Sequence, residues 1–138
     1  MNRYSWEDIF VGMEEKFQVT VTPEMLEQFK SITGDCNPLH NEKEFAMEKG
    51  YPDKVVFGML TASFLSTLAG VYLPGEKSLI HKVESKFAKP VFVGDVLTVS
   101  GKVKDMDERF HCFNMKVEIH NQKKEKVLRG SMEIGIID

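Results

Sequence analysis

Hydrophobic and polar residues alternate through the second half of the chain, from residue 78 to residue 136. This period of two is typical of strands with one face buried. One strand is predicted to run through Val83 to Phe87, and three more contain the alternating residues that begin at Leu97, Phe113 and Leu128. The polar linkers KDMDER and NQKKEK separate these last three and suit antiparallel hairpins.

The first half of the chain changes from strand-like to helical spacing. Phe17, Val19 and Val21 alternate with polar residues and predict a first strand. Thr22 and Pro23 then have the pattern of a helix N-cap followed by proline at the first helical position. Apolar residues at helical spacing follow as far as Ile32, and Gly34 is a natural C-terminal stop. The segment DCNPLH is therefore expected in the loop after this helix.

Two more helices are predicted before the strands begin again. Asn41 with Glu44 resembles a capping arrangement for a short helix from Phe45 to Lys49. The stretch GMLTASFLSTLAGVYL is apolar on most faces, so we expect a helix that protein surrounds on nearly all sides. The predicted fold class is α+β, a single domain over residues 1–138 with a mostly antiparallel sheet wrapped around one buried helix. One sheet around one helix leaves a face and an edge to cover, so we expect a homodimer or a higher homo-oligomer.

Composition narrows the class of protein. The 138 residues, 42% hydrophobic and 28% charged, fit one globular domain, and the net charge of −3 gives no basic surface for nucleic acid. The longest apolar run is interrupted by glycine, serine and threonine, so no membrane association is expected. Cys36 and Cys112 lie far apart, which favours reduced thiols, and no apolar leader begins the chain. We expect a cytoplasmic protein.

The segment GDCNPLH combines a carboxylate, an amide and an imidazole around one proline. A curved loop of this length can turn Asp35 and His40 toward one point, where the pair can hold a water, remove its proton and return a proton to a substrate. An imidazole ordinarily titrates near pH 6.5, which suits this task. Asn37 can fix the loop or orient a substrate. The alternative is an Asx turn with an exposed histidine, since aspartate, asparagine and proline are all turn residues.

The start of the apolar helix is a second candidate site. Free N–H groups and the positive end of the helix dipole favour a developing negative oxygen there, and Gly58 allows a carbonyl to approach closely. The alternative is that Gly58 only permits close packing. Ser66, two turns further on, can donate a hydrogen bond to a carboxylate or bond its hydroxyl to a backbone carbonyl.

The sequence lacks the motifs of metal binding, of serine hydrolases and of phosphate-binding loops. Cys36 and His40 have no second pair to complete a metal site, and no metal or cofactor is expected. No G-x-S-x-G elbow and no glycine-rich phosphate loop occurs.

Three stretches, GDCNPLH, VVFGMLTASFLS and KFAKPVFVGDVLTV, together with the opening WEDIFVGMEEKFQVTVT, resemble the MaoC-like (R)-specific enoyl-CoA hydratases. The resemblance covers nearly the whole chain in order and spacing, and its D-x-N-P-x-H motif is specific. It implies a hotdog fold and the hydration of a trans-2-enoyl thioester of CoA, or of acyl carrier protein, to an (R)-3-hydroxyacyl thioester, or the reverse dehydration.

The resemblance also implies a role for each candidate residue. Asp35 and His40 activate the water, Asn37 supports the pair or the substrate, Gly58 gives an N–H to the thioester carbonyl, and Ser66 orients the aspartate. Phe57 stands where family members often carry histidine, which bears on substrate choice. An acyl thioesterase and a non-catalytic acyl-thioester-binding module are the competing functions.

Overall fold

Five strands form one antiparallel sheet in the computed structural model, which describes residues 1–138. The order across the sheet is β1-β3-β4-β5-β2, so that β1 and β2 are its edges. The hairpin between β3 and β4 is shorter than predicted, because β3 continues through most of the polar KDMDER segment and pairs with the start of β4. The strands are β1 (Glu14–Thr20), β2 (Ser78–Phe87), β3 (Val96–Asp107), β4 (Cys112–His120) and β5 (Lys126–Ile136).

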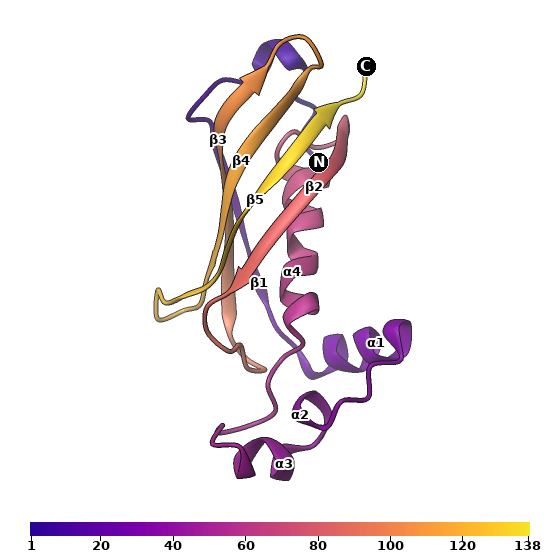
Figure 1. Ribbon diagram of the computed structural model, residues 1–138, viewed down its shortest axis with the longest axis vertical. Helices are drawn as coiled ribbons and strands as arrows, with labels where there is room; N and C mark the ends of the chain where they lie inside the picture. Colours follow the sequence, from indigo (N-terminus) through magenta and orange to yellow (C-terminus); the bar gives the residue numbers. More distant parts are fainter.

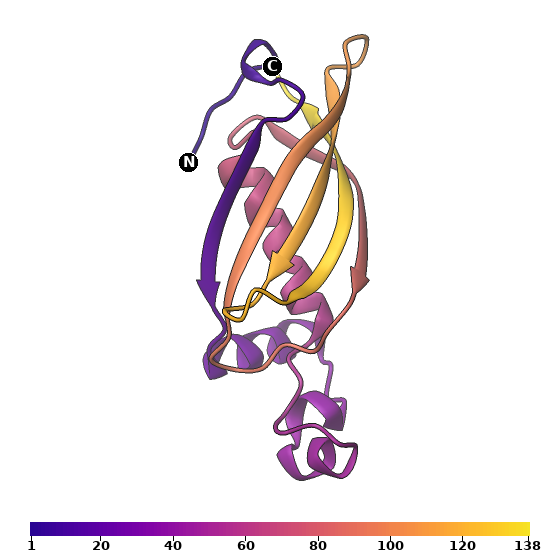
Figure 2. The same ribbon diagram turned by 90° about the vertical axis from the view of Figure 1, so that its left-hand side faces the viewer.

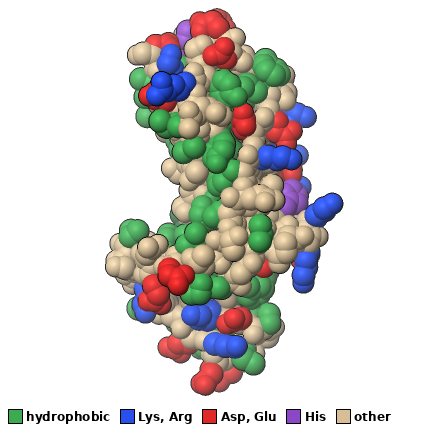
Figure 3. Space-filling model, turned by 180° about the vertical axis from the view of Figure 1, so that it is seen from behind, with side chains coloured by type: hydrophobic (Ala, Val, Ile, Leu, Met, Phe, Trp, Pro, Cys, Tyr) green, Lys and Arg blue, Asp and Glu red, His purple; other side chains and the backbone are tan.

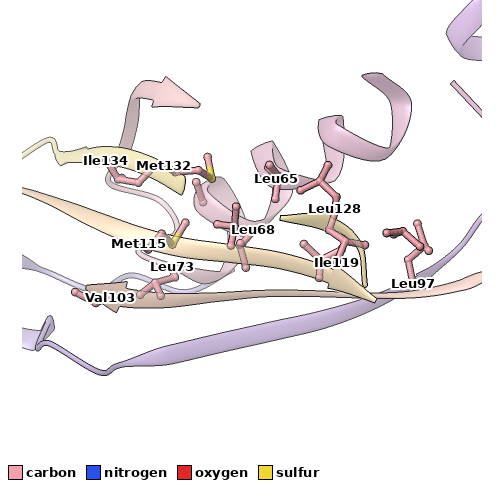
Figure 4. Packing of buried hydrophobic residues seen from close by; sticks show 14 of the residues in the cluster. Leu65, Leu68, Leu73, Leu97, Val103, Met115, Ile119, Leu128, Met132 and Ile134 are labelled. Atoms are coloured by element: carbon pink, nitrogen blue, oxygen red, sulfur yellow. The ribbon is translucent and has the colours of Figure 1, made fainter. Parts of the chain in front are cut away.

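Helix α4 (Gly58–Thr67) lies along one face of this sheet, as predicted (Figures 1 and 2). It continues into a π-helical turn, η2 (Leu68–Tyr72), which also contacts β1, β2 and β3. The alternating residues of β3, β4 and β5 meet the helix in the hydrophobic core (Figure 4). Core residues labelled there include Leu65, Leu68, Leu97, Met115, Ile119, Leu128 and Met132.

The prediction that protein surrounds α4 on nearly all sides is wrong for one of its faces. Leu60, Thr61 and Leu65 are buried, but Met59 and Ser66 are exposed. The sheet covers only the side of the helix that faces it, and the remaining face borders a hollow on the surface (Figure 3). Its apolar composition made this open face indistinguishable from a buried one in the sequence.

Helix α1 (Pro23–Thr33) has the predicted ends. The Thr22 hydroxyl accepts a hydrogen bond from the Met25 N–H at 3.3 Å, and Pro23 occupies the first turn. Gly34 closes the helix with φ of 71°, a left-handed conformation that glycine adopts without steric cost. A short 3₁₀ helix, η1 (Trp6–Asp8), precedes β1.

Helices α2 (Pro38–Asn41) and α3 (Lys43–Glu48) extend beyond one end of the sheet (Figures 1 and 2). The predicted cap of α3 by Asn41 is wrong, because the helix begins at Lys43 after Glu42. A separate helical turn, α2, begins at Pro38 with Asn37 as its N-cap. Asn41 belongs to this turn. The Asn41 amide instead donates to the carbonyl oxygen of Asn37 at 2.8 Å.

One carboxylate on the outer face of the sheet contributes to stability. Glu118 on β4 alternates with core residues and therefore points away from α4. Partial burial raises its pKa, but hydrogen bonds from Lys126 and Lys116 outweigh this effect and hold the pKa below its usual value.

None of the helices combines the length and the hydropathy that crossing a membrane requires.

Candidate active site

The loop between α1 and α2 is held by hydrogen bonds of its own side chains. A carboxylate oxygen of Asp35 accepts from the N–H of Asn37 at 3.1 Å, and the side-chain oxygen of Asn37 accepts from the N–H of Leu39 at 2.9 Å. The loop therefore does contain the Asx-type turns that its composition predicted. These bonds use one oxygen of Asp35, and the carboxylate is exposed. Asn37 acts here as the N-cap of α2.

His40 is not the exposed histidine of a simple surface turn. Its Nδ1 lies 2.6 Å from the carbonyl oxygen of Val55, and its ring packs against Phe57 with centroids 4.5 Å apart. Because a carbonyl oxygen only accepts, Nδ1–H must be the donor. In a neutral ring, Nε2 is then the nitrogen that can accept a proton. The turn alternative therefore holds for Asp35 and Asn37 but not for His40.

Gly58 lies in the same cavity as His40. This cavity, called the His40 cavity below, has a volume of about 270 Å³. The first intrahelical bonds of α4 run from Leu60 and Thr61 to the Phe57 carbonyl, so the N–H groups of Gly58 and Met59 have no partner within the helix. The packing alternative for Gly58 also has support, because a Cβ there would lie 3.1 Å from the Phe87 ring. The residues that line the cavity include His40, Tyr51, Gly58, Thr61, Phe87 and Lys89.

Asp35 and Ser66 line a second hollow on the open face of α4. This Asp35 cavity has a volume of about 560 Å³ and a largely apolar wall, and Figure 3 shows hydrophobic side chains along the hollow. Ser66 makes no hydrogen bond to a backbone carbonyl, whereas Ser63 does, to Leu60 at 2.6 Å. The residues that line it include Phe29, Asp35, Met59, Ser66, Ile80 and Val83.

Four of the five predicted site residues thus fall into two pairs, and the fifth, Asn37, lines neither cavity. The structure brings His40 to Gly58 and Asp35 to Ser66, with the first turns of α4 contributing to both cavities. No hydrogen bond joins Asp35 to His40, so their joint action on one water stays a prediction. The five candidate residues nevertheless belong to two parts of the chain only, the motif near one end of the sheet and α4, which runs from that end along the sheet face (Figures 1 and 2).

Sequence reasoning missed two contributors to the His40 cavity. The Val55 carbonyl that orients the imidazole is a backbone group fifteen residues from His40, and no residue type signals it. Thr61 was overlooked within an apolar helix, although its place three residues after Gly58, on the same helix face, was a detectable signal.

The sheet wrapped around one helix is the hotdog fold of the MaoC-like hydratases. The MaoC like domain matches residues 10–126, and the chain belongs to this family. Among curated relatives, the (R)-specific enoyl-CoA hydratase of Aeromonas caviae is 33% identical over 104 residues, which are 75% of this chain and 78% of that protein. The 3-hydroxybutyryl-CoA dehydratase of Methylorubrum extorquens is 30% identical over 101 residues, 73% of this chain.

The chain differs from one relative in length but agrees closely with a solved structure in fold. The chain spans 64% of the length of the Methylorubrum relative. The solved structure of the (R)-hydratase from A. caviae superposes with a TM-score of 0.90 at 28% identity, covering 94% of this chain and 98% of that one. The family and the fold expected from the motif are therefore confirmed.

Proposed function

We propose that this protein adds water to a trans-2-enoyl-CoA to form an (R)-3-hydroxyacyl-CoA, or removes it in reverse. The observation that carries the proposal is the imidazole of His40, whose Nδ1–H is committed to the Val55 carbonyl while Nε2 is left to exchange a proton beside the start of α4. Relatives named for hydration and dehydration of CoA thioesters support the substrate class.

The proposed reaction needs only groups that the chain supplies. Asp35 and His40 bind a water and remove its proton as the oxygen bonds to C3 of the enoyl group. The electron pair moves onto the thioester oxygen, and a proton is then delivered to C2. The Gly58 N–H donates to the thioester oxygen when its charge is greatest, which lowers the barrier. Asn37 holds the loop, and Ser66 orients the Asp35 carboxylate. No metal or cofactor takes part.

The stereochemistry of the product tests this assignment. Hydration of crotonyl-CoA should yield a product that an (R)-specific 3-hydroxyacyl-CoA dehydrogenase oxidises and an (S)-specific one does not. The variant His40→Asn should lose about 10²- to 10⁴-fold in kcat, the usual contribution of an acid–base group. Release of free CoA without hydration would identify a thioesterase instead, and binding without turnover would identify a binding module.

We also infer that the active form is a homodimer paired through β2. This strand is a sheet edge whose outer backbone groups have no strand partner, and it exposes Leu79, Ile80, Val83 and Phe87. Native proteins rarely leave such an edge uncovered, because it promotes uncontrolled pairing. A second copy would bury this row together with the open face of α4, and the Asp35 cavity lies between these two surfaces.

A charge at the edge tests the dimer. The variant Val83→Glu should be monomeric in light scattering after size-exclusion chromatography, because the carboxylate would be buried without a partner. Phe110→Glu is the matched control, since Phe110 is also exposed but lies in the β3–β4 hairpin. A monomeric wild type, or equal dissociation of both variants, would contradict the inference.

A further inference from the structure

Thr61 is the only polar residue among the 32 buried residues of this chain. It is 2% exposed, and its hydroxyl oxygen has no hydrogen-bond partner in the structure. Helical threonines usually bond back to the carbonyl of the residue four positions earlier. Here that carbonyl belongs to Phe57, and it already accepts from the N–H groups of Leu60 and Thr61. A buried hydroxyl without a partner destabilises a fold, so its place calls for a reason.

The location of Thr61 supplies that reason. Thr61 lines the His40 cavity together with Gly58. Residues three apart share a helix face, and side chains lean toward the helix N-terminus, so Thr61 extends over the turn that begins at Gly58. Gly58 has no side chain to cover its backbone. Thr61 and Gly58, whose N–H is unpaired within the helix, therefore line the same small volume.

We propose that Thr61 is a second hydrogen-bond donor to the thioester carbonyl oxygen, beside the Gly58 N–H. This inference rests on the proposed function. As the hydroxyl oxygen of water bonds to C3, the C1 oxygen gains charge and becomes a stronger acceptor. The Thr61 O–H bond to it then strengthens, while its proton stays on Thr61. A donor that acts more strongly in the transition state than in the ground state raises kcat more than it lowers KM.

Replacing the hydroxyl with a methyl group separates this role from a structural one. The variant Thr61→Val keeps the shape of the side chain and removes a buried hydroxyl that lacks a partner, so its melting temperature should be equal to or above that of the wild type. Its kcat for enoyl-CoA hydration should fall about 10- to 100-fold with KM nearly unchanged. Thr61→Ser retains the donor and should keep most of the activity. Full activity in Thr61→Val would overturn the proposal.

Ser85 provides a matched control. Its hydroxyl is also buried without a partner, but it lies on β2 and does not line the His40 cavity. Ser85→Ala should therefore leave kcat unchanged. An equal loss of activity in this variant and in Thr61→Val would mean that both act through packing, and would contradict the assignment.

A spectroscopic measurement reads the proposed bond directly. Crotonyl-CoA labelled with ¹³C at C1 is bound to Asp35→Asn, which should not turn it over, and the carbonyl stretch is recorded by difference infrared spectroscopy. The band should lie below that of free crotonyl-CoA, and adding Thr61→Val should reverse part of this shift while Thr61→Ser should not. An identical band in all three proteins would overturn the role of Thr61 alone. A wild type that neither binds nor converts any enoyl-CoA would overturn the proposed function as well.

Discussion

Replacing Phe57 with leucine tests how the core of the protein supports His40. Phe57 is 2% exposed and precedes the first residue of α4. Its ring contacts two others, Phe29 with centroids 5.0 Å apart and His40 with centroids 4.5 Å apart. Leucine is apolar and fills most of the volume, but it cannot make either ring contact.

The magnitude follows from these contacts. Truncating a buried phenylalanine to alanine costs about 3–5 kcal/mol, and leucine retains much of the buried surface. Each ring pair contributes about 0.5–1.5 kcal/mol beyond burial, so losing both should lower the free energy of unfolding by about 1–3 kcal/mol. The His40 imidazole keeps its hydrogen bond to the Val55 carbonyl but loses its packing contact with the Phe57 ring. We expect kcat about tenfold lower, equivalent to about 1.4 kcal/mol of activation free energy.

Phe113→Leu is the matched control. Phe113 is 1% exposed in the same hydrophobic core, but it lies on β4 and lines neither cavity. Urea unfolding followed by circular dichroism should show a loss of stability in both variants, larger in Phe57→Leu because Phe113 makes no aromatic ring pair. Only Phe57→Leu should show a lower kcat at a temperature where both are fully folded. Unchanged kinetics in Phe57→Leu, or an equal kinetic loss in the two variants, would refute the idea that Phe57 positions His40.

Three further predictions concern thiols, pH and a helix cap. Cys36 is exposed, whereas burial raises the pKa of the Cys112 thiol. Iodoacetamide should therefore label Cys36 at least tenfold faster than Cys112 in the folded protein, as followed by mass spectrometry. Equal labelling rates would contradict the burial of Cys112. The lowered pKa of Glu118 stabilises the fold fully above its unfolded value of about 4.5, and this contribution disappears as pH falls through the lower folded pKa. Urea titrations should therefore show Glu118→Gln less stable than wild type at pH 7 and the difference shrinking below pH 4.5; a constant difference would argue against it. Thr22→Ala removes the cap of α1 and should lower the free energy of unfolding by about 0.5–2 kcal/mol, while an unchanged urea midpoint would show that the cap contributes nothing.

The sequence predicted those parts of the fold that depend on local pattern. The strands followed the alternation of residues, and Thr22 and Gly34 marked the ends of α1, because caps act on neighbouring backbone groups. The errors arose where local signals compete. Asn41 had the pattern of a cap for α3, but it belongs to the turn that begins at Pro38, and its amide donates to the Asn37 carbonyl oxygen. The open face of α4 was missed because a helix composed of apolar residues does not show which side the sheet covers.

The members of the candidate site stay a prediction, and its geometry could not be predicted from the sequence. The motif from Asp35 to His40 was conspicuous in the sequence, and the structure places α2, which begins within this motif, beyond one end of the sheet. The partner that fixes the His40 ring is a backbone carbonyl brought close only by folding. The division of His40 and Asp35 between two cavities likewise depends on how α4 lies relative to the motif, which no spacing along the chain specifies.

The central claim is that Asp35 takes part in adding water to an enoyl thioester, and one measurement tests it most directly. The absorbance of the conjugated enoyl thioester is followed after purified protein is mixed with crotonyl-CoA. Wild type and the control variant Asp105→Asn, which alters an exposed aspartate on β3, should both remove the chromophore rapidly. Asp35→Asn should be slower by about 10²- to 10⁴-fold while remaining folded and able to bind the substrate. Equal rates in Asp35→Asn and wild type, or no loss of the chromophore with any enoyl-CoA from short to long, would contradict the account.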